Sequence, residues 1–320
     1  GWVAGPMLYM ERGLGCRWAG LLYAGLCAAA SFGMGSMVQA NAISETLEFS
    51  FSMPPVLIGG LLVLLSGRIM AGGAGAIAGA AEKMVPVSAG IYMAASAAVL
   101  FLFRENIPSA FGMIFQDAFS FRSAAGGAVG LLASKSVQYG IARGVFSNEA
   151  GLGSAAITAA CADTDEPVKQ GLISMTGVFF DTMVICTVTG LAICCSGTLG
   201  TADGAGRPLT GAALTLRAFE TVLGPLAPWL IGVALGLFAF TSVLGCAVQA
   251  ETTASYLLGP GAVRPCRVLY GLAVFAGAVI PMATVLQLAD LANALMAFPN
   301  LVCLLLLSGE IAGECGRKER

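Results

Sequence analysis

A short polar cluster interrupts an apolar region and has the composition best suited to binding a small solute. Within RGVFSNEAGLGS, residues 143–154, the side chains of Ser147, Asn148 and Glu149 are consecutive, and glycines flank or follow them. A break in a membrane helix frees backbone amides and carbonyls, which can bind ions and small zwitterions. The stretch therefore predicts a discontinuous helix with a binding site. The alternative is a kinked structural helix whose polar groups bond to neighbouring helices.

The apolar runs contain few acidic residues. A carboxylate is costly in hydrocarbon, so we expect Glu149 to be paired, hydrated or protonated, with Arg143 and Lys135 as the nearest cations. Either a structural ion pair or a role in ion coupling fits Glu149. Asp181 and Asp290 are single acids that could each pair with a neighbour or lie near a helix end, and we predict neither as a ligand.

Two further groups of polar residues lie inside apolar runs. Ser36 and Gln39 are three residues apart and share a helical face, whereas Asn41 points elsewhere. We expect Gln39, and less strongly the other two, to line a site; interhelical hydrogen bonding is the alternative. The hydroxyls of Thr241 and Ser242 suit a hard cation such as sodium, with bonding to their own helix as the alternative.

Composition places the chain in one class. It is 57% hydrophobic and 11% charged, whereas a soluble domain carries about 25% charged residues. An all-α polytopic membrane protein, surrounded by a lipid bilayer, is the class that fits. The sequence has no basic patch for nucleic acid. It has no His, no CxxC motif and no Walker loop, so we predict neither an enzyme nor a bound cofactor.

The apolar runs predict about eight transmembrane helices. We expect residues 72–84 to form a short interfacial helix or a connector and 106–123 a loop, with a further helix at 211–223. The fourth run is too long for one straight crossing of a ~30 Å hydrocarbon core at ~1.5 Å per residue, so a break is needed. The runs are 17–43, 54–66, 86–103, 126–161, 170–195, 226–249, 265–281 and 284–307.

Charge predicts the orientation of these helices. If residues 1–16 are cytoplasmic, eight crossings place most Lys and Arg residues, including Arg68, Lys169 and Arg264, on the cytoplasmic side. Fewer, such as Arg104 and Arg217, fall on the other side. The loop at 163–169 is then cytoplasmic.

Several motifs resemble the alanine or glycine:cation symporter family. RGVFSNEAGLGSAA (143–156) resembles it closely, GPMLYMERGLG (5–15) is similar to the family's GPMYYIEKGLG, and FGMGSMVQAN (32–41) to its FGTGNMVQAN. Matching stretches follow in order to the end of the chain. They are AEKMVP (81–86), TDEPVKQGL (164–172), FAFTSVLG (238–245) and AFPNLVCLLLLSG (297–309).

The resemblance implies a LeuT-like fold of two inverted repeats in a single transport domain, residues 1–320. Residues 1–125 would be the remainder of the first repeat and a connecting loop, and 126–320 the second repeat, with a broken helix near 146–152. The first residue is Gly, so we expect the chain to be truncated at its N-terminus, without the first broken helix. The resemblance further implies a multi-pass protein of the bacterial inner membrane.

The family imports alanine or glycine with sodium as the coupling ion. By resemblance, the substrate site would be lined by Gln39, Ser36, Asn41, Phe146, Ser147, Asn148, Gly151 and Cys246. Thr241 and Ser242 would bind sodium. The family has Asn at the position of Ser36 and Trp at that of Cys246, so the smaller side chain at 246 would reshape the pocket. Proton coupling through Glu149 and an inactive fragment are the alternatives; the oligomeric state is not predicted.

Overall fold

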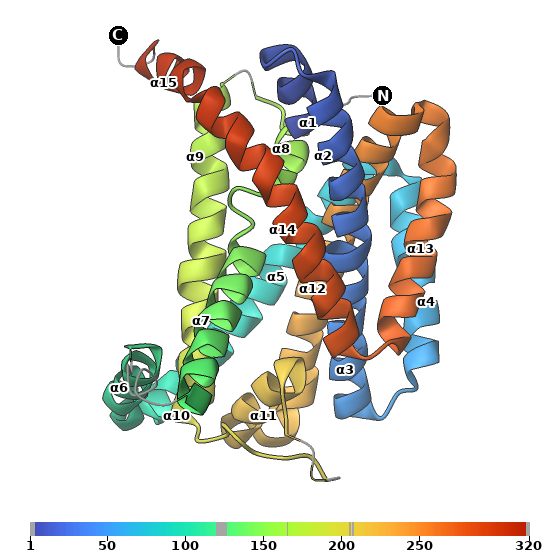
Figure 1. Cartoon of the computed structure of the whole chain (residues 1–320). Coiled ribbons are helices and arrows are strands. Elements are labelled where there is room, and N and C mark those ends of the chain that lie inside the picture. The colour runs from blue at the N-terminus through green and yellow to red at the C-terminus, as the bar shows by residue number, and fades with distance from the viewer. Residues whose placement is uncertain (1–3, 120–126, 165, 205, 207, 318–320) are drawn as a thin grey trace. The chain divides into compact units, whose positions relative to one another are not determined.

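The computed structural model describes residues 4–119, 127–164, 166–204, 206 and 208–317, whose regular structure is helical apart from an isolated bridge between Ala202 and Pro208 (Figure 1). Six helical segments are long and apolar enough to cross a membrane: Arg17–Phe51, Gly73–Leu102, Pro167–Cys195, Gly211–Leu258, Pro260–Val279 and Ala283–Leu306. Helix Pro55–Ala71 is apolar but shorter. These observations support an all-α polytopic membrane protein.

The helices are labelled in chain order. They are α1 (Pro6–Leu8), α2 (Arg17–Ala30), α3 (Gln39–Phe51), α4 (Pro55–Ala71), α5 (Gly73–Leu102), α6 (Ile107–Phe119), α7 (Gly127–Asn148), α8 (Ser154–Ala159), α9 (Pro167–Val178), α10 (Cys186–Cys195), α11 (Gly211–Leu223), α12 (Ala227–Leu258), α13 (Val263–Val279), α14 (Met282–Leu306) and α15 (Ser308–Arg317). π-Helical turns occupy Tyr9–Gly13, Ser31–Val38 and Phe179–Ile185, so the last two join α2 to α3 and α9 to α10 without a break.

The chain forms two compact units. The first contains Gly1–Val87, Glu149–Gly177 and Gly236–Arg320, and the second contains Ser88–Asn148 and Val178–Leu235. Each unit is described by itself below.

In the first unit, α13 packs against α4, α3 and the π-turn Ser31–Val38, and α14 packs against α2 and the same turn. The apolar core gathers side chains of α3, α4, α12 and α13, with Tyr270 and Leu244 fully buried. Close approach depends on small residues: a Cβ at Gly277 would lie 2.4 Å from the Cα of Met37. This unit surrounds the predicted site residues of the segment α2–α3 and of α12.

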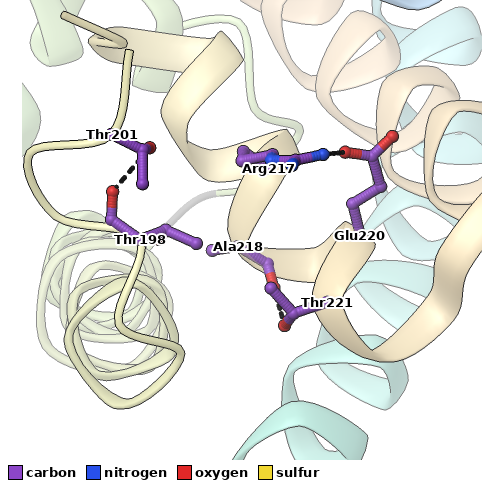
Figure 2. Close-up of polar contacts among 6 residues, drawn as sticks. All are labelled: Thr198, Thr201, Arg217, Ala218, Glu220 and Thr221. Atoms are coloured by element: carbon purple, nitrogen blue, oxygen red, sulfur yellow. Dashed lines mark hydrogen bonds and ion pairs between the residues drawn. The ribbon is translucent and has the colours of Figure 1, made fainter.

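In the second unit, α10 packs against α6 and α11. The buried Tyr92 shares a 2.6 Å hydrogen bond with Thr189 and packs its ring 5.3 Å from that of Phe219. Figure 2 shows the local contacts of α11 and the segment before it. Arg217 pairs with Glu220, while Thr221 and Thr201 donate to the carbonyls of Ala218 and Thr198.

Two sequence predictions were wrong. The segment 72–84, expected to be a short interfacial helix or a connector, is from Gly73 on part of α5, a continuous helix of 30 residues with Pro86 inside it. Alanine, the best helix former, is abundant there, and its propensity outweighs the glycines and Pro86, whose ring removes a single hydrogen bond. Most of the expected loop 106–123 is α6, on which Phe111 and Phe115, one turn apart, pack their rings 6.5 Å apart. Residues 120–123 lie outside the described part.

The other predicted runs all contain helix, and the helix predicted at 211–223 is confirmed as α11. The fourth run differs from the rest because it is divided into α7 and α8. Part of the run, residue 126, lies outside the described residues.

Candidate substrate and ion site

The fourth run is interrupted at its polar cluster. α7 ends at Asn148 and α8 begins at Ser154, and the link has positive φ at Glu149 (52°), Gly151 (83°) and Gly153 (84°). Positive φ is uncommon for any residue other than glycine, so Glu149 adopts a sparsely populated conformation. At Gly153 a Cβ would also lie 2.6–2.9 Å from atoms of neighbouring side chains, which makes glycine a requirement there. The boundary between the two units falls between Asn148 and Glu149, so each side is considered separately.

In the first unit, side chains donate hydrogen bonds to backbone carbonyls of the link between α7 and α8. The Asn300 amide donates to the carbonyl of Gly151 at 2.9 Å, and the Tyr23 hydroxyl donates to that of Leu152 at 2.8 Å. Tyr9 in turn donates to the side-chain oxygen of Asn300. The carbonyls of Gly151 and Leu152 therefore stabilise the protein, although the sequence had predicted free backbone groups at the break.

Glu149 forms a hydrogen bond with the next helix, α8. Its carboxylate accepts a 2.8 Å hydrogen bond from the hydroxyl of Ser154, the first residue of α8. The backbone amide of Leu152 donates to the carbonyl of Glu149 at 3.1 Å and closes a turn. Glu149 thus helps to hold the interruption in its shape.

On the side of the second unit, the last residues of α7 face the π-turn Phe179–Ile185 and the start of α10. The Ser147 hydroxyl lies 3.4 Å from a carboxylate oxygen of Asp181 and 3.3 Å from the sulfur of Cys186. The Asn148 amide lies 3.4 Å from the Thr182 hydroxyl. The two 3.4 Å contacts, with Asp181 and with Thr182, are long for hydrogen bonds to oxygen, so a bound ligand could compete for these groups.

Phe146, also predicted to line the site, is half-buried, and the guanidinium of Arg143 lies 5.1 Å from its ring centre. This is a cation–π contact. It gives Arg143 a partner on its own helix, one turn before the polar residues.

The three predicted residues of the first run have different surroundings. Ser36 is fully buried in the π-turn and donates to the carbonyl of Phe32. Asn41 donates to the carbonyls of Gly277 and Ile280, at 2.9 and 2.6 Å, and so caps the C-terminal end of α13. Gln39 is partly exposed, and its amide has no hydrogen-bond partner among the described residues. Of the three, Gln39 is the side chain best able to bind a ligand.

The predicted sodium ligands both bond within their own helix. Thr241 and Ser242 donate to the carbonyl of Phe238 at 2.8 and 3.2 Å. The oxygens keep lone pairs after donating, so these bonds fix the hydroxyls without removing their capacity to bind a cation. Nearby on α12, Cys246 is buried against Gly35, where an added Cβ would lie 2.2 Å from the cysteine Cβ.

Sequence reasoning missed Tyr9, Tyr23 and Asn300. Each is an isolated polar group among apolar residues, a signal that was present in the sequence but gave no indication of which backbone group it contacts. Among the described residues, no cluster of three His, Cys, Asp or Glu side chains could hold a metal ion. A cation would instead depend on hydroxyls, amides, backbone carbonyls and single carboxylates.

Comparison with known proteins identifies the family. Residues 1–316 match the model of the sodium:alanine symporter family. The chain is 42% identical to an uncharacterized transporter of Haemophilus influenzae, over 95% of this chain and 66% of that protein. It is 38% identical to the sodium/alanine symporter AgcS of Methanococcus maripaludis, over 98% and 68% of the two chains. It is 37% identical to the protein of Bacillus subtilis named "Probable sodium/glutamine symporter GlnT", over 96% and 63%.

The chain thus spans about two thirds of the length of these curated relatives. Because the family model extends over nearly every residue and two of these relatives have assigned or proposed sodium-coupled transport, the assignment does not depend on a single motif. The chain belongs to the sodium:alanine symporter family.

Proposed function

We propose that this multi-pass membrane protein carries out sodium-driven symport of a small neutral amino acid, alanine or glycine, into the cell across the bacterial inner membrane. The observation that carries the proposal is the family match over residues 1–316. The interrupted helix α7–α8 supports it, because broken membrane helices provide binding groups for substrates and ions near the midplane. Transport would proceed by alternating access in a LeuT-like fold.

In this proposal each unit contributes its own substrate-binding groups, described separately: Gln39 and the break at Gly151 in the first unit, and Phe146, Ser147 and Asn148 in the second. The side-chain oxygens of Gln39 and of Asn148 are each able to accept a hydrogen bond from an ammonium group. Thr241 and Ser242 contribute oxygens to sodium. Ser36, Asn41 and Cys246 act through helix packing around the site, since their polar groups are bonded or buried.

The test is uptake of labelled alanine by vesicles that contain the protein expressed from its complete gene. An inward sodium gradient should drive uptake, whereas an equal choline gradient should not. Asn148→Ala should lower uptake by about tenfold or more, the loss expected when a substrate group loses its hydrogen bond. Ser109→Ala, which removes an exposed hydroxyl on α6, is the control. Uptake that is unaffected by sodium and unchanged in Asn148→Ala would contradict the proposal.

Two arms of the experiment address the alternatives. In a proton-coupled carrier that uses Glu149, Glu149→Gln would abolish uptake driven by a pH gradient, and sodium would be irrelevant. The relative named for glutamine makes substrate size a question as well. Competition of unlabelled glycine, alanine and glutamine against labelled alanine distinguishes a small pocket from a larger one.

A further inference from the structure

We propose that Tyr270 is a positioning residue for sodium binding, because its hydroxyl aligns the part of α12 that carries Thr241 and Ser242. The proposal rests on the proposed function, in which these two hydroxyls contribute oxygens to sodium. Tyr270 lies on α13. The residues of α12 from Gly236 onward, α13 and the π-turn Ser31–Val38 all belong to the same compact unit.

The first observation is a buried hydrogen bond from α13 to the backbone of α12. The Tyr270 hydroxyl donates to the carbonyl of Val243 at 2.7 Å. Val243 directly follows Ser242 and is two residues from Thr241. Both of these hydroxyls donate to the carbonyl of Phe238, at 2.8 and 3.2 Å, and are therefore held to the same stretch of helix. A bond to that backbone from the neighbouring helix restrains the two hydroxyls with it.

The second observation is that neither the carbonyl nor the packing requires this bond. Val243 lies inside the continuous helix α12, where each carbonyl accepts from the amide four residues later. Tyr270 is fully buried in an apolar cluster that includes Leu244 and Val274. A phenylalanine would fill nearly the same volume without bringing a hydroxyl into this core, where a hydroxyl is costly unless it is bonded. Packing alone therefore does not explain the hydroxyl, whereas alignment of α12 does.

The third observation is that the ring of Tyr270 also contacts the π-turn Ser31–Val38. Its centre lies 5.7 Å from the ring centre of Phe32, with the two planes tilted by 59°. Aromatic rings at this separation attract each other beyond the effect of burial. The carbonyl of Phe32 accepts the hydrogen bond of Ser36, and Gln39 follows the turn directly. Tyr270 thus joins the segment that carries the proposed sodium ligands to the segment that leads to Gln39.

The expected consequence is a change in sodium affinity. Binding groups have to be held within about 0.5 Å of their productive positions. Groups that orient the ligands of a metal without touching it typically change its affinity by about 10- to 100-fold when they are removed. The packing of α12 retains other restraints when the hydroxyl is lost, so we expect a smaller loss here, about three- to tenfold.

The test compares Tyr270→Phe with the unaltered complete protein in sodium-driven uptake of labelled alanine. The sodium concentration that gives half-maximal uptake should rise about three- to tenfold, and the maximal rate at saturating sodium should change little. The rise in thermal unfolding temperature that sodium causes in detergent, without alanine, should become smaller, because weaker binding stabilises less. Tyr92→Phe removes a buried hydroxyl that is bonded to Thr189 in the second unit. It is the matched control and should leave both sodium measurements unchanged.

A second comparison asks whether Tyr270 acts through the proposed sodium ligands. In a Ser242→Ala background, one of the oxygens that Tyr270 aligns is already absent. Tyr270→Phe should therefore raise the half-maximal sodium concentration by a smaller factor in this background than in the unaltered protein. Equal factors in the two backgrounds would show that Tyr270 acts independently of Ser242 and would overturn the proposal.

The outcomes separate this proposal from the proposed function. If uptake by the unaltered protein is unaffected by sodium, the proposed function fails. If uptake is sodium-driven and Tyr270→Phe leaves the half-maximal sodium concentration unchanged, the role of Tyr270 alone is wrong. A lower maximal rate without a shift in that concentration identifies a purely structural role and overturns the proposal as well. Should Tyr270→Phe yield little folded protein, the folded fraction isolated by size-exclusion chromatography carries the test: a sodium-induced rise in unfolding temperature equal to that of the unaltered protein overturns the proposal.

Discussion

At the scale of single residues, Asn300 holds the interruption between α7 and α8 through two hydrogen bonds. Its amide donates to the carbonyl of Gly151, and its oxygen accepts from Tyr9. Asn300→Asp keeps the shape and the acceptor for Tyr9 but places an oxygen against the carbonyl. Because Asn300 is 1% exposed, the unsatisfied pair should cost about 1–3 kcal/mol. We expect a lower thermal unfolding temperature in detergent and reduced alanine uptake.

Tyr9→Phe is the control for this prediction. It removes one hydrogen bond but leaves the bond from Asn300 to Gly151 in place, so its effect should be smaller. If the unaltered protein and Asn300→Asp unfold at the same temperature, the hydrogen bond from Asn300 to Gly151 contributes nothing to stability.

The sequence predicted the position of the helix break but could not have predicted the contacts that hold it. The type and spacing of Ser147, Asn148 and Glu149 indicated a break near them, because three consecutive polar residues followed by glycines suit no continuous membrane helix. The contacts of Asn41 with α13 and of Asn300 with the break join residues 236 and 149 positions apart. Such contacts depend on tertiary packing, which a single sequence does not specify.

At the scale of elements, the close approach of the π-turn Ser31–Val38 to α12 depends on Gly35. An added Cβ would lie 2.2 Å from the Cβ and 2.6 Å from the sulfur of Cys246. Gly35→Ala must therefore push the helices apart, at a cost of about 1–3 kcal/mol. We expect a lower unfolding temperature and a smaller folded fraction on size-exclusion chromatography.

Gly25→Ala is the matched control, since a Cβ added at Gly25 on α2 would have nothing within 4 Å and alanine favours the helix. A double variant, Gly35→Ala with Cys246→Gly, should recover part of the loss, because it removes both clashing atoms. Additive effects of the two substitutions would contradict the proposed contact.

Three of the four boundaries between the two units lie beside a helix irregularity. They follow Val87, Asn148 and Gly177, next to Pro86, the helix break and the π-turn Phe179–Ile185 respectively, whereas the fourth follows Leu235 inside the continuous helix α12. The sequence predicted an interruption near Pro86 but placed a helix start there, because proline is also common in the first turn. What it could not show is that the helix continues through Pro86.

Pro86→Ala tests the role of this irregularity. Restoring the missing backbone donor in the interior of α5 should raise the unfolding temperature by an amount corresponding to about 1 kcal/mol or more, and a stiffer helix should slow alanine uptake. Pro55→Ala is the control, because Pro55 occupies the first turn of α4, where a proline costs little. Faster or unchanged uptake by a stabilised Pro86→Ala protein would exclude a mechanical role for the proline.

At the scale of the whole molecule, the distribution of Lys and Arg predicts an orientation in the membrane. With eight crossings and residues 1–16 in the cytoplasm, the positive-inside rule predicts that the segment between α8 and α9 is cytoplasmic. Cys161 lies in this segment and is exposed, whereas Cys27 in α2 is fully buried. A membrane-impermeant maleimide should therefore label Cys161 in inside-out vesicles and leave it unlabelled in right-side-out vesicles, as read by mass spectrometry of its peptide.

Cys27 should remain unlabelled in both preparations until the protein is denatured, which controls for unfolding. Labelling of Cys161 in right-side-out vesicles alone would reverse the orientation. It would also reverse the direction of the α7–α8 interruption, so that the C-terminal end of α7 beside Asp181 would approach the midplane from the cytoplasmic side. The orientation thus decides from which side the end of α7 approaches the midplane, and the labelling result fixes how sodium-dependent uptake is to be interpreted.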